Sequence, residues 1–155
     1  MLDKTDKKIL EQLQRDAGLS VAELSARIGL SATPCWKRVK RLEEEGFIRR
    51  RVALADRAKL GLKVTVFVSI RTNEHDAAWL ENFARVAASF PEIVELHRMS
   101  GDVDYLMKVV TSDVEGYDRF YKKLIKAVRL TDVSSAFAME QIKYSTELPL
   151  DEMPS

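Results

Sequence analysis

The chain has 155 residues, enough for one ordinary domain or two small ones, and its 46% hydrophobic and 32% charged residues indicate a globular protein with a core. No apolar run is long enough to cross a bilayer, and the charged N-terminus MLDKTDKKIL lacks the apolar centre of a signal peptide, so we expect a cytoplasmic protein without a membrane partner. Cys35 is the single cysteine, which excludes an internal disulfide and a cysteine-rich zinc site.

The net charge of +1 is unevenly distributed along the chain. Residues 1–51 contain 12 Lys and Arg against 8 Asp and Glu, whereas the remaining residues contain 13 against 16. A basic segment joined to an acidic remainder suggests that the N-terminal third binds nucleic acid.

Capping residues and apolar periodicity predict two helices in the first thirty residues. We expect the first helix over about Thr5–Asp16, with Asp3 as its cap. Ser20 and Glu23 have the S-x-x-E spacing of a capping box and start the second helix, which ends at Gly29. The short turn IGLS leads into a third helix, so the second and third helices form a helix-turn-helix candidate.

The predicted third helix runs from its cap Ser31 to about Glu45 and has two chemically different faces. Its apolar residues fall within one arc of about 80° and should pack on the first two helices: Ala32, Cys35, Val39 and Leu42. The opposite face is mostly cationic and suits the major groove, because Lys and Arg reach phosphates and guanine edges. The candidate DNA contacts on this helix and just after it are Ser31, Thr33, Pro34, Trp36, Lys37, Arg38, Lys40, Arg41, Arg49 and Arg50.

Alternatives remain open for this region. A solvated charged face on an ordinary helical bundle would look similar, and the acidic run Glu43–Glu45 favours that interpretation. Trp36 could touch DNA or cover the domain's own core. Phe47 and Ile48 are expected to close the core, and the run Arg49–Arg51 either meets phosphates or forms a solvated linker.

The rest of the chain predicts a mixed domain over residues 63–150, after the N-terminal domain of residues 1–50 and a linker strand over residues 51–62. The β-branched stretch VTVFVSIR predicts a buried strand, IVELHRMS and YLMKVVT predict two more, and DVSSAFAMEQIKYST predicts the last. Helices are expected from about Asp76 to before Pro91 and again after the cap Asp113. The apolar face of the second of these helices comprises Val114, Tyr117, Phe120, Tyr121, Leu124 and Ile125. Residues 151–155 are expected to fray as a tail.

The element order strand-helix-strand-strand-helix-strand is that of an α+β, ferredoxin-like domain, with both helices on one face of an antiparallel sheet. An exposed apolar sheet face favours pairing with another copy, so we expect a homo-oligomer.

The closely spaced Asp102 and Asp104 raise the question of a metal or acid/base site. Two carboxylates without further oxygen ligands make a weak Mg²⁺ site, and neither His75 nor His97 has metal-ligand spacing. The sequence also has no glycine-rich phosphate loop. We therefore expect no catalytic residue, metal or cofactor, and a turn-stabilising role for Asp102, because Asp side chains bond to turn backbones.

Five stretches together resemble the leucine-responsive/asparagine regulator family, Lrp/AsnC: LDKTDKKILEQLQRD, LSATPCWKRVKRLEEEGFI, LGLKVTVFV, PEIVELHRMSGDVDYLMKV and SSAFAMEQIKYSTELPL. The resemblance covers residues 2–150. It implies a winged-type helix-turn-helix domain, followed by a RAM domain named for the regulation of amino-acid metabolism. It also implies dimers formed through the C-terminal sheets, often assembled into tetramers or octamers, and a free amino acid bound between neighbouring RAM domains.

The same resemblance implies where the effector binds. The family's G-x-x-D-Y pattern falls on Gly101, Asp104 and Tyr105, and serines at the start of the last strand lie near the same pocket. The candidate effector contacts are Met99, Ser100, Gly101, Asp102, Asp104, Tyr105, Ser134 and Ser135. A carboxylate such as Asp104 suits an ammonium group, and backbone N–H groups suit a carboxylate.

The chain departs from the family in carrying KAVRLTDV where Pro-Gly is usual, and a wholly basic segment near Arg51 where an aromatic residue is frequent. TPCWKR, DYLMKV and FAMEQIKYST resemble a branch that includes cysteine-responsive regulators of sulfur metabolism.

Three functions are compatible with these features of the sequence. The first is a sequence-specific transcription regulator that binds double-stranded DNA and responds to an amino acid. The second is a DNA-organising oligomer without an effector response. The third is a small-metabolite enzyme of ferredoxin-like fold with a helical extension.

Overall fold

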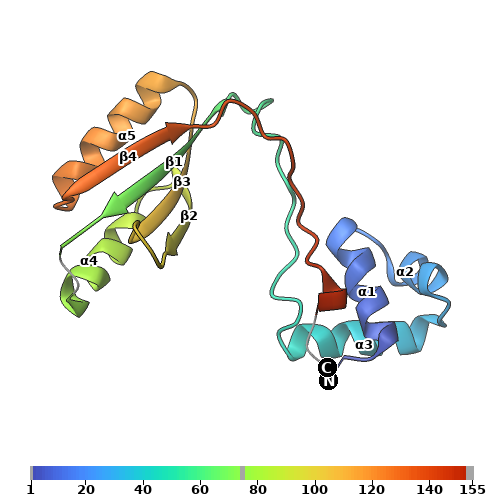
Figure 1. Ribbon diagram of the computed structural model, residues 1–155. Helices are drawn as coiled ribbons and strands as arrows, with labels where there is room; N and C mark the ends of the chain where they lie inside the picture. The colour runs from blue at the N-terminus through green and yellow to red at the C-terminus, as the bar shows by residue number, and fades with distance from the viewer. Residues whose placement is uncertain (1, 74–75, 153–155) are drawn as a thin grey trace. The chain divides into compact units, whose positions relative to one another are not determined.

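The computed structural model describes residues 2–73 and 76–152, which form two compact units. One unit combines the chain up to Leu54 with the segment from Ile142 onward, and the other spans Ala55–Gln141 (Figure 1). This differs from the expected domain over residues 63–150, because the final residues pack with the N-terminal helices. Within the described residues, none of the helices has the length and hydropathy needed to span a membrane.

The N-terminal unit contains the three predicted helices: α1 (Lys4–Arg15), α2 (Val21–Ile28) and α3 (Ala32–Glu44). The expected caps of the first two are present, since Asp3 and Ser20 each form a capping box with the residue three positions on. Gly29 ends α2 with φ 73°. Ser31 occupies the N-cap position of α3, but its side chain makes no capping hydrogen bond.

The core of this unit is built from one face of each helix. Its buried apolar residues are Ile9, Leu10, Leu13, Leu19, Leu24, Cys35, Val39 and Leu42. Two expected members lie outside it: Ala32, in the first turn of α3, is exposed, and Phe47 is 46% exposed. Ile48 packs on the core instead, because its backbone N–H donates to the Leu42 carbonyl and returns the chain onto α3.

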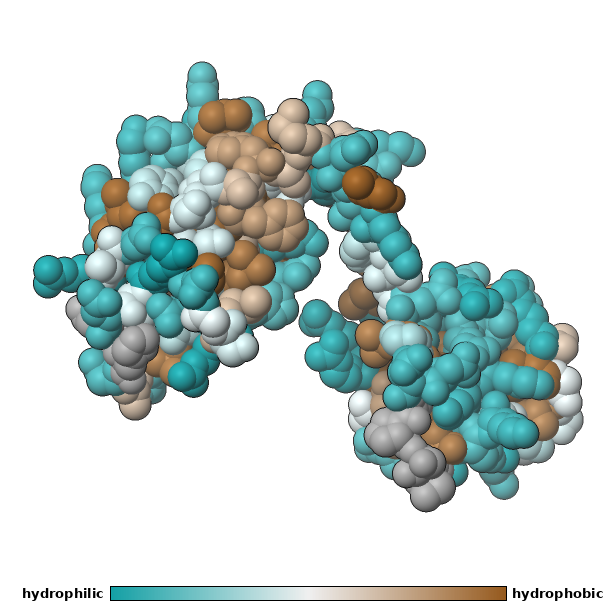
Figure 2. Space-filling view, viewed as in Figure 1, coloured by the Kyte–Doolittle hydropathy of each residue, from teal (hydrophilic) through white to brown (hydrophobic). Residues whose placement is uncertain are grey.

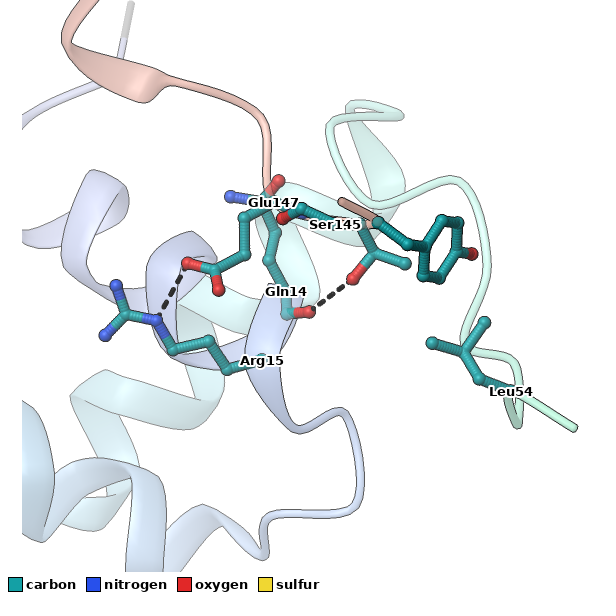
Figure 3. Close-up of a pocket in the computed structure, with 7 residues that line it drawn as sticks. Gln14, Arg15, Leu54, Ser145 and Glu147 are labelled. Atoms are coloured by element: carbon teal, nitrogen blue, oxygen red, sulfur yellow. Dashed lines mark hydrogen bonds and ion pairs between the residues drawn. The ribbon is translucent and has the colours of Figure 1, made fainter. Parts of the chain in front are cut away.

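The segment that precedes the expected tail is bound to α1, and residues 153–155 of that tail lie outside the described part of the chain. Leu148 N–H donates to Gln14 Oε1 at 2.7 Å, and Thr146 Oγ1 donates to the Gln14 carbonyl at 3.1 Å. Arg15 and Glu147 form an ion pair at 2.8 Å, beside a shallow hollow of about 260 Å³ (Figure 3). Leu150, in the short 3-10 helix η1 (Leu150–Glu152), packs against the core of the helical unit.

Replacing Gln14 by alanine should loosen this segment. The loss of the side-chain bond to Leu148 is expected to lower the stability of the N-terminal unit by about 1 kcal/mol. Amide hydrogen exchange at Leu148 should accelerate in this variant. Gln12→Ala is the matched control, because the Gln12 amide oxygen accepts a bond from Arg27 on α2. Equal amide exchange rates at Leu148 in the two variants would argue against a role of Gln14 in holding this segment.

The second unit has the predicted α+β, ferredoxin-like order. Its strands are β1 (Val64–Arg71), β2 (Ile93–Arg98), β3 (Tyr105–Thr111) and β4 (Asp132–Phe137). They form one antiparallel sheet in the order β2-β3-β1-β4. The helices α4 (Ala77–Ala88) and α5 (Val114–Ala127) follow β1 and β3 and cover one face (Figure 1).

Three details of this unit differ from expectation. The last strand ends at Phe137 rather than near residue 146, because pairing with β1 stops there. The segment of residues 51–62 is not a strand and turns at residues 57–61. On α5, Val114 and Ile125 are exposed at the edges of the face that packs on the sheet.

The sheet face opposite the two helices is open in a single chain. In β1, Val66, Val68 and Ile70 point into the helix-side core, so the alternate residues face the other way. This open face includes Phe67, which is 39% exposed, and the pair Lys108–Glu95 at 2.8 Å. Figure 2 shows apolar surface, in brown, on this unit.

Candidate functional site

Most of the predicted DNA contacts are exposed, either on α3 or close to its two ends. The exposed members of the set are Ser31, Thr33, Pro34, Trp36, Lys37, Lys40, Arg49 and Arg50. Trp36 is 49% exposed, so its ring lies at the surface rather than covering the core. Lys40 lies 3.7 Å from Glu43, a pair whose exposure leaves the ammonium group free to exchange partners.

Arg38 and Arg41 are engaged within the helical unit. Arg38 Nη1 donates to Asp3 Oδ2 at 2.6 Å and to Asp6 Oδ1 at 2.7 Å. Arg41 Nη2 donates to Asp6 Oδ2 at 2.5 Å. Both arginines are partly buried, with side chains 31% and 43% exposed, whereas the Asp6 side chain is only 1% exposed. The two cations that sequence reasoning assigned to DNA therefore also fix α3 against the start of α1.

The same network keeps the Asp3 carboxyl ionised. The Asp6 backbone N–H, and after it the Arg38 guanidinium, lower the pKa of Asp3 from 3.8 to about 2. Because the pKa is lowered in the folded state, the stabilisation that this cap contributes is fully present above about pH 4. This stabilisation is lost as the pH falls through about 2.

Lys37 is the residue of α3 whose replacement best tests DNA binding separately from stability. It is exposed, and within the described part of the chain it forms no ion pair. Lys37→Ala should weaken binding to a preferred duplex by roughly 1–3 kcal/mol if a base is read, without lowering the melting temperature. Gel shifts at several salt concentrations test this, with Lys8→Ala on α1 as the charge-matched control. Equal losses in both variants would show that α3 does not read this DNA.

The predicted effector loop lies between β2 and β3 and is held by backbone bonds. Gly101 adopts φ 109°, a conformation that residues with a Cβ rarely adopt. Met99 N–H donates to the Asp104 carbonyl at 2.8 Å, which closes the loop. Asp104 N–H donates to the Ile70 carbonyl at 3.0 Å, and Thr72 N–H donates to Asp104 Oδ2 at 2.8 Å. Asp104 is therefore bonded to the end of β1, whereas Asp102 is exposed at the turn.

The remaining predicted effector residues are on different faces of the sheet. The Tyr105 ring lies in the helix-side core, with centroids 5.8 Å from Trp79 and 5.0 Å from Phe83. Ser134 pairs with Ser69 of β1, which places it on the open face. Ser135 pairs with Val68 on the helix side.

Ser135 has a partner on the helix side. Its hydroxyl bonds the Tyr117 hydroxyl of α5 at 2.5 Å, and burial raises the pKa of Tyr117. The structure therefore brings together Met99–Asp104 and leaves the Tyr105 and Ser135 side chains on the other side of the sheet.

Three residues near the loop were missed by sequence reasoning. Arg71, at the end of β1, donates from Nε to the Asp102 carbonyl at 2.7 Å. Its Nη1 lies 3.3 Å from Asp132 Oδ2 at the start of β4. Thr72 supplies the backbone bond to Asp104. None of these contacts has a local sequence signal, because each depends on the pairing register of strands distant in sequence.

The described residues contain no cluster of three or more His, Cys, Asp or Glu side chains that could hold a metal ion. His75 lies outside the described residues, and His97 lies 3.3 Å from Glu95. Cys35 is fully buried in the helical core, and burial raises the pKa of its thiol, as fits a packing residue rather than a nucleophile.

Two family models match the chain, one for each part. The model described as winged helix-turn-helix DNA-binding matches residues 2–49. The model described as Lrp/AsnC ligand binding domain matches residues 65–148. The first matched range contains α1–α3, and the second contains the sheet apart from Val64, the first residue of β1.

Relatives and solved structures agree with these matches. The glutamate uptake regulatory protein of Zymomonas mobilis is 51% identical, over 97% of this chain and 92% of its own. An AsnC family transcriptional regulator from Agrobacterium tumefaciens is 59% identical with a TM-score of 0.96, covering 99% of this chain and 100% of that one. The transcriptional regulator NMB0573 of Neisseria meningitidis, solved as an L-Met complex, is 33% identical with a TM-score of 0.93, covering 97% and 98%.

The relatives are regulators and not enzymes, which confirms the expected absence of catalysis. Both halves of the chain match, and the matches extend over nearly its full length. The chain is a DNA-binding transcription regulator with an Lrp/AsnC ligand-binding domain, and it belongs to the Lrp/AsnC family.

Proposed function

We propose that this regulator recognises specific DNA sequences through α3 and alters its DNA occupancy when a free amino acid binds at the loop of residues 99–104. The observation that carries the effector role is the position of Asp104. One of its carboxylate oxygens accepts the Thr72 N–H, so the carboxylate is held beside the end of β1. A fixed carboxylate suits the ammonium group of an amino acid.

The DNA-binding role rests on the exposed cations of α3 and of the residues after it, with Arg49 and Arg50 adding phosphate contacts. Base reading is assigned to Thr33, Trp36, Lys37 and Lys40, which share the outer part of this helix. As a DNA-bound regulator, the protein would act in the cytoplasm.

The proposed active form is a homo-oligomer, built first as a dimer through the open sheet face and then as a tetramer or octamer. Phe67 is partly exposed there, and single chains with such a face gain stability by pairing. An effector that binds one assembly more tightly than another shifts the population toward the assembly it prefers. The size of this shift is limited by the difference between its affinities for the two assemblies.

Three amino acids are the first candidates for the effector. L-methionine is present in the Neisseria meningitidis complex, and the Zymomonas mobilis relative is named for glutamate uptake. Cysteine is the third, from the resemblance of TPCWKR and FAMEQIKYST to a cysteine-responsive branch.

A thermal-shift screen of the twenty amino acids, followed by gel shifts on duplexes selected by the protein, tests the proposal. A ligand that binds the native state raises the melting temperature by mass action. We expect one or a few amino acids to raise it and to change DNA affinity. If none changes melting temperature, oligomer size or DNA affinity, the protein is a DNA-organising oligomer. If no salt-sensitive, sequence-dependent DNA binding is found, both DNA functions fail.

A further inference from the structure

Arg71 joins three segments at the end of the sheet where the proposed effector loop lies. It is the last residue of β1, and Asp132, the first residue of β4, is its register partner. Alternation along β1 places the Arg71 side chain on the open face, the face that also carries Ser69 and Ser134. The side chain thus belongs to the same surface as the proposed effector site.

The guanidinium group is fixed by two contacts that leave part of it unused. Nε donates to the Asp102 carbonyl at 2.7 Å, and Nη1 lies 3.3 Å from Asp132 Oδ2. A guanidinium has five N–H donors in a rigid fork, so these two contacts set its plane and leave further donors, including those of Nη2. The side chain is 57% exposed, so the remaining donors are accessible to a ligand.

The charges around Arg71 suit a zwitterion. Asp104 offers a carboxylate that is held by the Thr72 N–H, and Arg71 offers a cation from the end of β1 beside the loop. An amino acid bound here could place its ammonium group against Asp104 and its carboxylate against Arg71. Arginine binds carboxylates with two parallel bonds, which a lysine ammonium cannot reproduce.

We propose that Arg71 is the residue of this site that recognises the α-carboxylate of the effector. The inference rests on the proposed effector function. It identifies the ligand class as molecules that carry a free carboxylate next to an ammonium group, and it predicts discrimination against the corresponding amides. Because the same guanidinium contacts Asp102 and Asp132, binding of a carboxylate to Arg71 would also change its contacts with the loop and with β4.

The test compares the tightest-binding of the twenty amino acids with its carboxamide, by calorimetric titration of the full chain. The carboxamide keeps the ammonium group and the side chain and removes only the negative charge. Wild type should prefer the amino acid by at least about tenfold, the usual difference for a charge-assisted contact. Arg71→Gln should reduce this preference to nearly one, and Arg71→Lys should restore part of it.

Arg98→Gln is the matched control, because Arg98 ends the neighbouring strand β2 and pairs with Tyr105 on the helix side of the sheet. It should keep the wild-type preference. An unchanged preference in Arg71→Gln would overturn the assignment. If Arg71→Gln lost affinity for the amino acid and for the carboxamide equally, the assignment would also be overturned, because Arg71 would then only support the loop. If wild type binds none of the twenty, the effector function itself fails and Arg71 has no ligand to recognise.

Discussion

Replacing Asp6 by alanine is expected to lower the free energy of unfolding of the N-terminal unit by about 3 kcal/mol. The Asp6 carboxylate is buried and accepts bonds from Arg38 and Arg41, as well as from the Asp3 backbone N–H. Alanine would remove the shared acceptor of the two guanidinium groups, so that Arg38 would keep only its bond to Asp3 and Arg41 would lose its buried partner. The arginines are partly exposed and can rehydrate, which places the cost at the lower end for a broken buried pair.

Fluorescence can isolate the unit in which this loss occurs, because the chain has one tryptophan in each unit, Trp36 and Trp79. In a Trp79→Phe background, urea unfolding followed by Trp36 emission reports on the helical unit alone. The midpoint should fall strongly in Asp6→Ala. Glu11→Ala removes the same charge from the same helix and should change stability by less than about 0.5 kcal/mol. Similar midpoints in the two variants would contradict the anchoring role of Asp6.

The Asp6 network changes how the recognition helix is tested. Arg41→Ala would weaken both the fold and any DNA contact, so lost binding could not be assigned to a base. Arg38 has the same difficulty, since it bonds both Asp3 and Asp6. Lys37, which forms no ion pair among the described residues, separates recognition from stability.

Local signals explain why so much of the fold could be predicted. The caps Asp3, Ser20, Asp76 and Asp113 each act within one helical turn, and their helices begin where expected. The strands of the sheet were recognisable from β-branched stretches, apart from the end of β4. Pairing of β4 with β1 stops at Phe137, opposite Val66, and the extent of pairing with a partner strand is not encoded in the residues of β4 itself.

The site could be predicted only in part, for a related reason. The loop with Gly101 and Asp104 was identifiable because its pattern is contiguous. The contacts of Arg38 and Arg41 with Asp6 span more than thirty residues, as does the bond from Arg71 to Asp102. A cation in such a pattern looks the same whether it faces DNA, a ligand or a buried carboxylate. The opposite placements of Ser134 and Ser135 likewise depend on register.

Asp104→Asn is expected to abolish the response to the amino-acid effector while leaving DNA binding close to wild type. The asparagine oxygen can still accept the Thr72 N–H, so the loop keeps its support and loses only the negative charge. Without that charge the ammonium group of the ligand loses its partner, and affinity should fall by at least about tenfold. Thermal shift with the effector, measured beside gel shifts without it, separates the two effects.

Asp102→Asn is the matched control, because Asp102 lies in the same loop and contributes its backbone carbonyl, rather than its side chain, to Arg71. It should keep most of the response. Asp104→Ala should lose the response and also lower the melting temperature slightly, because the bond from Thr72 is then unmade. A normal response in Asp104→Asn would remove the carboxylate from ligand binding and limit Asp104 to holding the loop against β1.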